Sequence, residues 1–361
     1  MVNEAWEVPK PAIEKRSVGN PERMILPLGL QAEISEKHDS QKGHDFTTET
    51  VAFQVDLKGR RYSIEAGTSN GGRKKPDEDF VCIKTYNLPG SDLTSLLWVG
   101  VKDGMGGMGS GDQASAHAAR AADEYLTRLS QSQDLWNQLK DKIPAEQARV
   151  NLAHKQKGLS EPVEEVTEEV TIELMLMKEV MEIQNRAVFE FNQRQAATSG
   201  ATTVDVFIFP DTDFLVEGHA GDSRYYHQKS GQRPRRSTID HNMAESLRAA
   251  GEEAAPGQSS QVYRSLGGGD LRLFTRLARP MDIGDNALLT CDGFADSLGD
   301  KSGGQLNRSG EPLHPNEWQM SDSMAKILNA PPSEDHAQWV MQQAQTAATD
   351  NLSFVRVLRT K

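Results

Sequence analysis

The chain has 361 residues, with 40 Lys and Arg against 52 Asp and Glu, a formal net charge of −12. This acidic balance argues against general binding to nucleic acid, which needs clustered Lys and Arg to displace the counterions of the phosphates. The two cysteines, Cys82 and Cys291, lie too far apart in the sequence to suggest a disulfide framework or a cysteine-rich zinc site. Because neither a signal peptide nor a run of about 18 apolar residues is present, we expect no membrane association and a cytoplasmic location.

Residues 1–50 mix Pro, Gly, Ser and both signs of charge without sustained periodicity. This composition predicts an N-terminal extension that is either wrapped on the main body or partly disordered. From residue 51 to 361 the sequence changes to short apolar runs separated by turn residues, which are typical of β-strands. The predicted strands lie at 61–70, 80–86, 95–104, 202–213, 214–223, 286–293 and 351–358.

Helices are predicted between and after these strands, at about 111–129, about 161–194, about 321–326 and 333–347. In the second helix, apolar residues recur at steps of three and four, as on one face of a helix. The segment 161–182 holds eight acidic residues and one lysine, so it carries −7 of the net charge. Its acidic side is interpreted as a solvated face, with a partner-docking surface as the alternative. Strands in two sets, with long helices between and after them, favour an α+β layered sandwich.

Two apolar strands lead into an aspartate and a glycine, Asp103-Gly104 and Asp292-Gly293, and Asp350-Asn351 stands immediately before the final strand. Each Asp-Gly pair alone is an ordinary turn signal. Three carboxylates projecting from one sheet edge would repel one another unless cations neutralised them, and Mg²⁺ and Mn²⁺ prefer such oxygen ligands. The pattern therefore predicts a site for hard divalent cations.

The run DGMGGMGSGDQAS at 103–115 resembles the signature of bacterial metal-dependent serine/threonine protein phosphatases of type 2C, the PPM family. Further matches follow in the family's order: PDED at 76–79, ATT at 201–203, HAGDSRYY at 219–226, TIDHN at 238–242, RSLGGG at 264–269, TCDGFADSL at 290–298 and TDN at 349–351. The resemblance covers roughly residues 60–358. It implies a four-layer αββα sandwich with two central antiparallel β-sheets. It also implies a catalytic domain at 51–361, with a helical insertion at about 131–198.

By the same resemblance, two Mn²⁺ or Mg²⁺ ions, or three, would bind at one end of the sandwich. Asp103 would bridge two metals and the Gly104 carbonyl would bind one of them. Asp292 and Asp350 would hold the other metal. Glu78 would reach a metal through water, Asp79 would orient metal-bound water, and Asp222 matches the acid that helps to hold a third ion.

Two departures from the family pattern concern the phosphate and the leaving group. The family places an arginine, which grips phosphate with two hydrogen bonds, where this chain has Lys74. Either the adjacent Arg73 takes this role or Lys74 supplies a less directional charge. Met105 stands where eukaryotic members carry a histidine proposed as general acid, and Met108 replaces another common histidine.

The resemblance implies a metal-dependent phosphatase that hydrolyses phosphoserine and phosphothreonine in proteins by direct attack of a metal-bridging water or hydroxide. The expected partners are phosphorylated proteins, together with a cognate Ser/Thr kinase or a regulatory protein. Two alternatives remain open: a pseudophosphatase that serves as a regulatory binding module, and a phosphatase of a small phosphorylated molecule.

Overall fold

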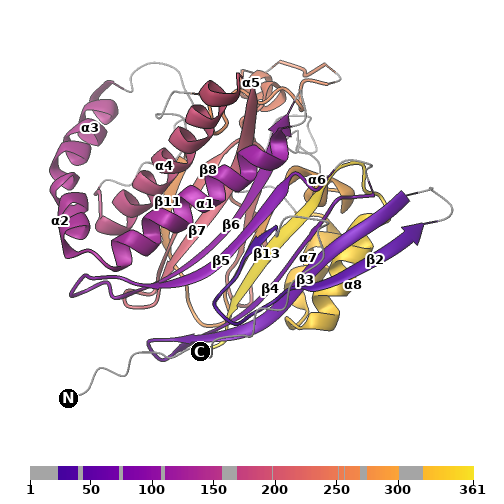
Figure 1. Cartoon of the computed structure of the whole chain (residues 1–361), viewed down its shortest axis with the longest axis horizontal. Helices are drawn as coiled ribbons and strands as arrows, with labels where there is room; N and C mark the ends of the chain where they lie inside the picture. The colour runs from indigo at the N-terminus through magenta and orange to yellow at the C-terminus, as the bar shows by residue number, and fades with distance from the viewer. Residues whose placement is uncertain are drawn as a thin grey trace.

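Two β-sheets packed face to face form the centre of the protein, as the computed structural model in Figure 1 shows. The structure describes residues 23–39, 44–72, 76–106, 110–156, 169–196, 198–250, 252–255, 257–268, 275–300 and 320–361. The first sheet has six strands in the order β1-β5-β6-β7-β8-β11 and the second has seven in the order β10-β9-β12-β13-β4-β3-β2. All described pairings are antiparallel except that of β1 with β5.

The strands of the first sheet are β1 (Met24–Ile25), β5 (Asp79–Asn87), β6 (Ser95–Gly106), β7 (Ser199–Phe209), β8 (Phe214–Ala220) and β11 (Thr275–Pro280). Those of the second are β2 (Glu33–Asp39), β3 (His44–Leu57), β4 (Arg60–Ser69), β9 (Arg224–Gln228), β10 (Arg235–Arg236), β12 (Asn286–Thr290) and β13 (Leu352–Arg359). The helices are α1 (Gly111–Ser130), α2 (Gln133–Asp141), α3 (Ile143–Gln156), α4 (Ile172–Gln195), α5 (Met243–Ala249), α6 (Asp292–Ser297), α7 (Asp322–Asn329) and α8 (Glu334–Gln345).

Helices cover the outer faces of both sheets, which gives four layers. Figure 1 shows α1 to α4 on one side and α7 and α8 on the other; α1 and α4 contact the first sheet, and α8 contacts β3, β4 and β13. The fold class predicted from the sequence, an α+β sandwich of the αββα type, is therefore confirmed. Among the described residues, no helix combines the length and the apolar character needed to cross a bilayer.

Alternation along the strands of the first sheet separates two hydrophobic cores. In β6, Leu97, Val99 and Val101 face the core between the sheets. The intervening Leu96 and Trp98 belong to the core under α1 and α4. Each strand is apolar on both faces because it lies in an inner layer of the sandwich.

A buried polar network ties α4 to the first sheet. Asp205 of β7 accepts hydrogen bonds from Trp98 Nε1 (2.7 Å) and Gln184 Nε2 (2.9 Å), and it pairs with the ammonium group of Lys102. Both Lys102 and Asp205 are fully buried. Because breaking one partner would leave an uncompensated charge, this network fixes where α4 sits.

Two predicted element boundaries differ from the structure. The helix expected at about 161–194 begins only at Ile172, because Thr171 is extended (φ −90°, ψ 168°) and its side chain accepts the amide of Leu174 as an N-cap. The first part of the predicted helix, 161–168, lies outside the described residues. The expected domain boundary at residue 51 falls inside β3, and the expected insertion at about 131–198 contains α2, α3 and α4.

Candidate metal centre

Along each strand, apolar side chains face the core between the two sheets, and polar side chains take over at one end of this core. On β6 the inward row Leu97, Val99 and Val101 continues with Asp103. Asp103 pairs in register with Asp79 of β5 and with Thr202 of β7. On β12 the row Ala287 and Leu289 continues with Cys291 just after the strand. The geometry of two facing sheets thus brings acids from separate strands together at one end of the core.

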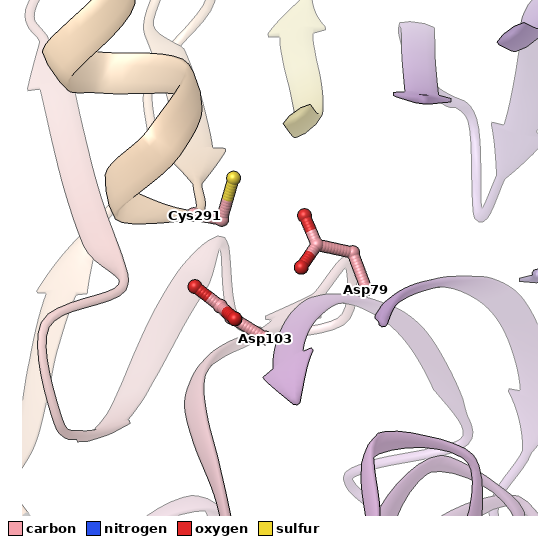
Figure 2. A group of neighbouring side chains, drawn as sticks. All are labelled: Asp79, Asp103 and Cys291. Atoms are coloured by element: carbon pink, nitrogen blue, oxygen red, sulfur yellow. The ribbon is translucent and has the colours of Figure 1, made fainter. Parts of the chain in front are cut away.

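The tightest part of this cluster joins Asp79, Asp103 and Cys291, whose possible ligand atoms all lie within 4.8 Å of one another. Figure 2 shows the three side chains converging on one space. Asp79 is fully buried, whereas Asp103 is half-buried. The cluster therefore has a dry side and a side that faces solvent.

The buried acids of the cluster raise one another's pKa values. Burial raises the pKa of Asp103 well above its ordinary value, and the charges of Asp79, Asp292, Asp222 and Asp350 raise it further. Burial and then the charge of Asp77 likewise raise the pKa of Asp79, against the opposing effect of Ser353 and Cys291. Like charges within a few ångströms disfavour simultaneous ionisation, so these acids form one electrostatic unit.

Asp292 and Asp350 reach the cluster from the second sheet. Asp292 is the first residue of α6, which Cys291 caps: its Sγ accepts the amides of Phe294 (3.3 Å) and Ser353 (3.2 Å). Asp350 precedes β13, and its Oδ1 accepts the amide of Asn351 (2.8 Å). A Cβ at Gly293 would lie 2.3 Å from the Asn351 carbonyl oxygen, so only glycine allows α6 to pack on this turn.

Glu78 and Gly104 meet at the N-terminus of α1. The Glu78 carbonyl oxygen accepts the Gly104 amide (3.1 Å) and the Ser115 hydroxyl (2.6 Å). A Cβ at Gly111 would lie 2.5 Å from the Gly104 carbonyl oxygen and 2.8 Å from Glu78 Oε1. The glycine at the start of α1 thus lets the helix end approach both oxygens.

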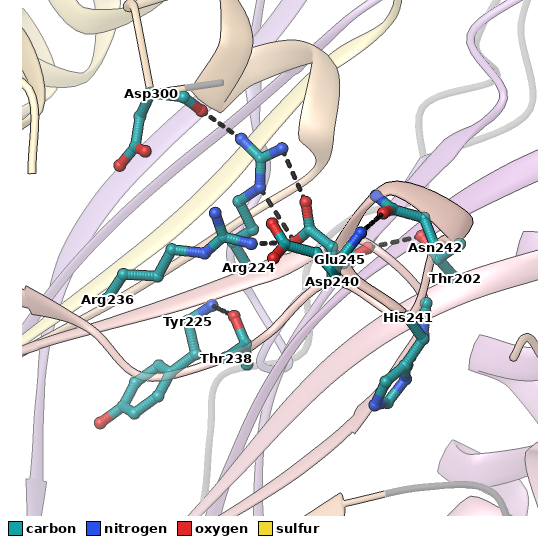
Figure 3. A network of polar contacts seen from close by, with 12 residues as sticks. Thr202, Arg224, Tyr225, Arg236, Thr238, Asp240, His241, Asn242, Glu245 and Asp300 are labelled. Carbon is teal, nitrogen blue, oxygen red and sulfur yellow. Dashed lines mark hydrogen bonds and ion pairs between the residues drawn. The ribbon is translucent and has the colours of Figure 1, made fainter. Parts of the chain in front are cut away.

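Asp222 precedes a network of buried charges in the chain, of which Figure 3 shows Arg224, Arg236 and Asp240. Arg224, fully buried, makes two hydrogen bonds to Asp240 (3.2 and 3.0 Å) and one to Asp296 (2.8 Å). The Gly221 amide donates to His241 Nδ1 (3.1 Å), and Gly221 adopts a left-handed φ of +103°. Burial, Asp292 and Asp240 raise the pKa of Asp222 well above its ordinary value.

Among the predicted site residues, the structure brings together Asp79, Asp103, Asp222, Asp292 and Asp350, with Glu78 and Gly104 beside them. Arg73 and Lys74, the two candidates for the phosphate grip, lie outside the described residues, as does Met108. The expectation that the aspartates end their strands is wrong in two cases. β6 continues past Asp103 to Gly106, and Asp292 opens a helix.

Two residues beside the acids were not among the predicted site residues. Cys291 belongs to the core between the sheets, and its thiol also faces the acids; burial and the charges of Asp79, Asp103 and Asp292 raise its pKa. Asp77 is buried beside Asp79 and accepts the Thr68 hydroxyl (2.6 Å) and the Asp79 amide (3.0 Å). Period-two alternation from Asp79 places Asp77 on the same face and would have indicated it.

The residues present fit a divalent metal site. Both carboxylate oxygens of Asp79 are buried, and neither makes a hydrogen bond of ordinary length to a described residue. Buried polar atoms in this condition are costly unless a further ligand satisfies them. A carboxylate-rich donor set suits Mg²⁺ or Mn²⁺.

Comparison with solved structures finds bacterial serine/threonine phosphatases over most of the chain. The serine/threonine phosphatase of S. agalactiae covers 86% of this chain and 99% of its own, with 17% identity and a TM-score of 0.55. The catalytic domain of the phosphatase PstP in complex with two manganese ions covers 88% and 99%, with 18% identity and a TM-score of 0.52. Stp1 from Staphylococcus aureus covers 86% and 94%, with 19% identity and a TM-score of 0.52.

Comparisons with protein-family models and with curated protein sequences give no match. The likeness to solved structures establishes that the chain has the fold of these bacterial phosphatases, as the motif resemblance implied. It covers nearly the whole length of the solved proteins.

Proposed function

We propose that the protein is a metal-dependent protein phosphatase that hydrolyses phosphoserine and phosphothreonine. The observation that carries the proposal is the convergence of five aspartates from two sheets on one partly open site, with one of them, Asp79, fully buried. The shared fold with bacterial serine/threonine phosphatases, one of them in complex with two manganese ions, supports it.

Asp103, which lies between Asp79 and Thr202 on the central strand of the cluster, would serve two ions, as the motif resemblance implies. Asp292 and Asp350 would hold one of these ions, and the Gly104 carbonyl with Glu78 would face the other. Asp222 would help to hold a third ion.

When bound, divalent cations activate water toward neutral pH and offset the charge of the phosphoryl oxygens. The protein itself contributes by holding the proposed metal ligands rigidly in place. Arg224 fixes the turn that carries Asp222, and Cys291 fixes the start of α6 that carries Asp292. Asp79 would orient metal-bound water, as the motif resemblance implies.

The proposed chemistry needs no covalent intermediate on a cysteine. Burial raises the pKa of the Cys82 thiol above its ordinary value, and burial and nearby carboxylates do the same for Cys291. Both side chains are fully buried. A neutral, buried thiol is a poor nucleophile, because the thiolate is the reactive form.

The direct test is release of phosphate from phosphothreonine peptides with Mn²⁺ or Mg²⁺, with EDTA, and by the Asp103→Asn variant. We expect activity that depends on metal and is lost in Asp103→Asn. The matched control is Asp123→Asn on α1, a half-buried carboxylate that pairs with Lys84 (2.6 Å), five residues along β5 from Asp79; it should keep activity.

The same assay separates the alternatives. Binding of phosphopeptides without release of phosphate would indicate a pseudophosphatase. Hydrolysis of small phosphate esters without any hydrolysis of peptides would indicate a metabolite phosphatase. Activity that survives EDTA would refute the metal-dependent proposal.

A further inference from the structure

A cleft of about 450 Å³ lies beside the carboxylate cluster, between the C-terminal turns of α4, the start of β7 and the loop 265–268. Phe189, Gln193, Ser199, Met105 and Leu266 are among its lining residues. Its size falls in the range of about 300–1,000 Å³ common for binding sites. The cleft is separate from the metal-binding side chains, and nothing in the proposed chemistry uses it.

The cleft begins two residues from Asp103 along β6. Met105 follows Asp103 by two residues on β6, so both side chains project from the same face of the strand. Two residues of extended chain span about 7 Å. A peptide whose phosphorylated residue lies at Asp103 therefore reaches the cleft with a residue one to three positions away.

Hydrogen bonds fix the walls of the cleft. Asn192 of α4 donates to the Ser199 carbonyl (2.6 Å) and accepts the Ser199 hydroxyl (2.7 Å). Asn185 accepts the Gly267 amide (2.8 Å), and the Leu266 amide donates to the Ala201 carbonyl (2.8 Å). These hydrogen bonds hold the cleft in shape before a ligand binds. Less conformational entropy of the protein is therefore lost on binding.

A close approach of backbone also shapes it. Gly267 has a left-handed φ of +94°, and a Cβ there would lie 2.7 Å from Val188 Cγ1. A Cβ at Gly200 would lie 3.3 Å from Met105 Cε and from Ser265 Oγ. Both glycines keep space that a side chain would occupy.

The lining chemistry is neutral. The described residues that line the cleft are uncharged: Phe189, Met105 and Leu266 supply apolar surface, and Asn192, Gln193, Thr198, Ser199 and Ser265 supply polar groups. Phe189 is 40% exposed, an unusual state for a large aromatic side chain. A charged guest would lose hydration here without gaining a counter-charge, whereas an aliphatic one would gain contact.

We propose that this cleft is a specificity subsite that receives an aliphatic side chain of the phosphoprotein substrate, within three residues of the phosphorylated residue. The inference rests on the proposed phosphatase function. It extends that function by naming what the enzyme selects beyond the phosphate.

The experiment compares phosphothreonine peptides that carry one Leu at each position from −3 to +3 in a glycine background. The all-glycine peptide is the reference, since it engages the metal centre without filling the cleft. We expect Leu at one of these positions to raise kcat/KM by about tenfold, mainly through KM, and Lys or Asp there to lack this gain.

Phe189→Ala should remove most of the Leu advantage, measured as the ratio to the all-glycine peptide in the same variant. The matched control is Phe214→Ala, because Phe214 is equally exposed (41%) but lies at the opposite end of the β7–β8 pair from Ser199. It should leave the ratio unchanged. Gln193→Glu should shift the preference toward Lys by about threefold, as expected for an exposed ion pair.

The outcomes separate the subsite from the proposed function. Hydrolysis of the all-glycine peptide with no dependence on Leu position, or equal effects of Phe189→Ala and Phe214→Ala, overturns the subsite and leaves the phosphatase standing. Failure to hydrolyse any phosphopeptide with Mn²⁺ refutes the phosphatase, and the subsite falls with it.

Discussion

Replacing Asp77 by Asn should stabilise the metal-free protein at high pH and leave it unchanged at low pH. Asp77 is 4% exposed, and burial raises its pKa from 3.8 to about 6, although Thr68, the Asp79 amide and Arg23 act in the opposite direction. The folded state then binds more protons than the unfolded state between these two values. Stability from this group is therefore present at low pH and lost as pH rises from about 4 to 6.

The magnitude follows from the two pKa values. A tenfold change in an equilibrium constant corresponds to about 1.4 kcal/mol, so ionising Asp77 costs about 3 kcal/mol above pH 6. Asn cannot ionise, and its amide can still accept the Asp79 N–H and donate to Thr68. With an unfolding entropy of about 2 cal/mol/K per residue, the gain corresponds to about 4 °C in Tm.

The assay is thermal unfolding in EDTA at pH 4 and at pH 8 for wild type, Asp77→Asn and Asp56→Asn. Asp56 is an exposed control whose pKa is lowered by its hydrogen bonds to Arg61. Asp77→Asn should match wild type at pH 4 and exceed it by about 4 °C at pH 8, while Asp56→Asn should show no such gain. An Asp77→Asn variant that is equally or less stable than wild type at pH 8 would refute the reasoning.

Three further predictions concern how the site is held. Arg224→Ala should destabilise the protein by about 3 kcal/mol in urea unfolding, because it removes one of the two buried guanidinium groups that pair with Asp240 and leaves only Arg236; a loss below 1 kcal/mol would contradict this. Gly111→Ala should lower kcat about 10- to 100-fold, since the added Cβ displaces the Gly104 carbonyl and Glu78; unchanged kinetics would show that this contact is unimportant. Cys291→Ser should keep Mn²⁺ affinity by calorimetry, because a hydroxyl can cap α6, whereas Cys291→Ala should weaken it; equal affinities would remove Cys291 from the positioning role.

The central strands and α1 could be predicted because their apolar runs are long and lie in inner layers. β1, β2, β3, β9, β10 and β11 were not among the predicted strands. In β9 (RYYHQ) and β11 (TRLARP), charged residues have tertiary partners, as Arg279 has in Glu217. Arg224, for example, reads as a solvated charge but is buried against Asp240. Such pairings join residues far apart in the sequence, so no local sequence pattern predicts them.

The sequence could predict which acids form the candidate site, but it could not predict how their side chains are arranged in space. Motif order identified the aspartates, and their meeting at one end of the core follows from strand register. The orientation of Cys291 depends on which face of β12 is inward, which only the pairing with β9 and β13 decides. The late start of α4 depends on the Thr171 cap, whose signal was hidden by valines that continue the helical period upstream.

The central claim is that the aspartates of both sheets hold divalent cations in one site. Anomalous diffraction from crystals grown with Mn²⁺ tests it most directly. The account predicts two manganese peaks flanking Asp103, one of them in contact with Asp292 and Asp350. Manganese found only away from Asp103, or no manganese at a concentration that supports phosphate release, would contradict it.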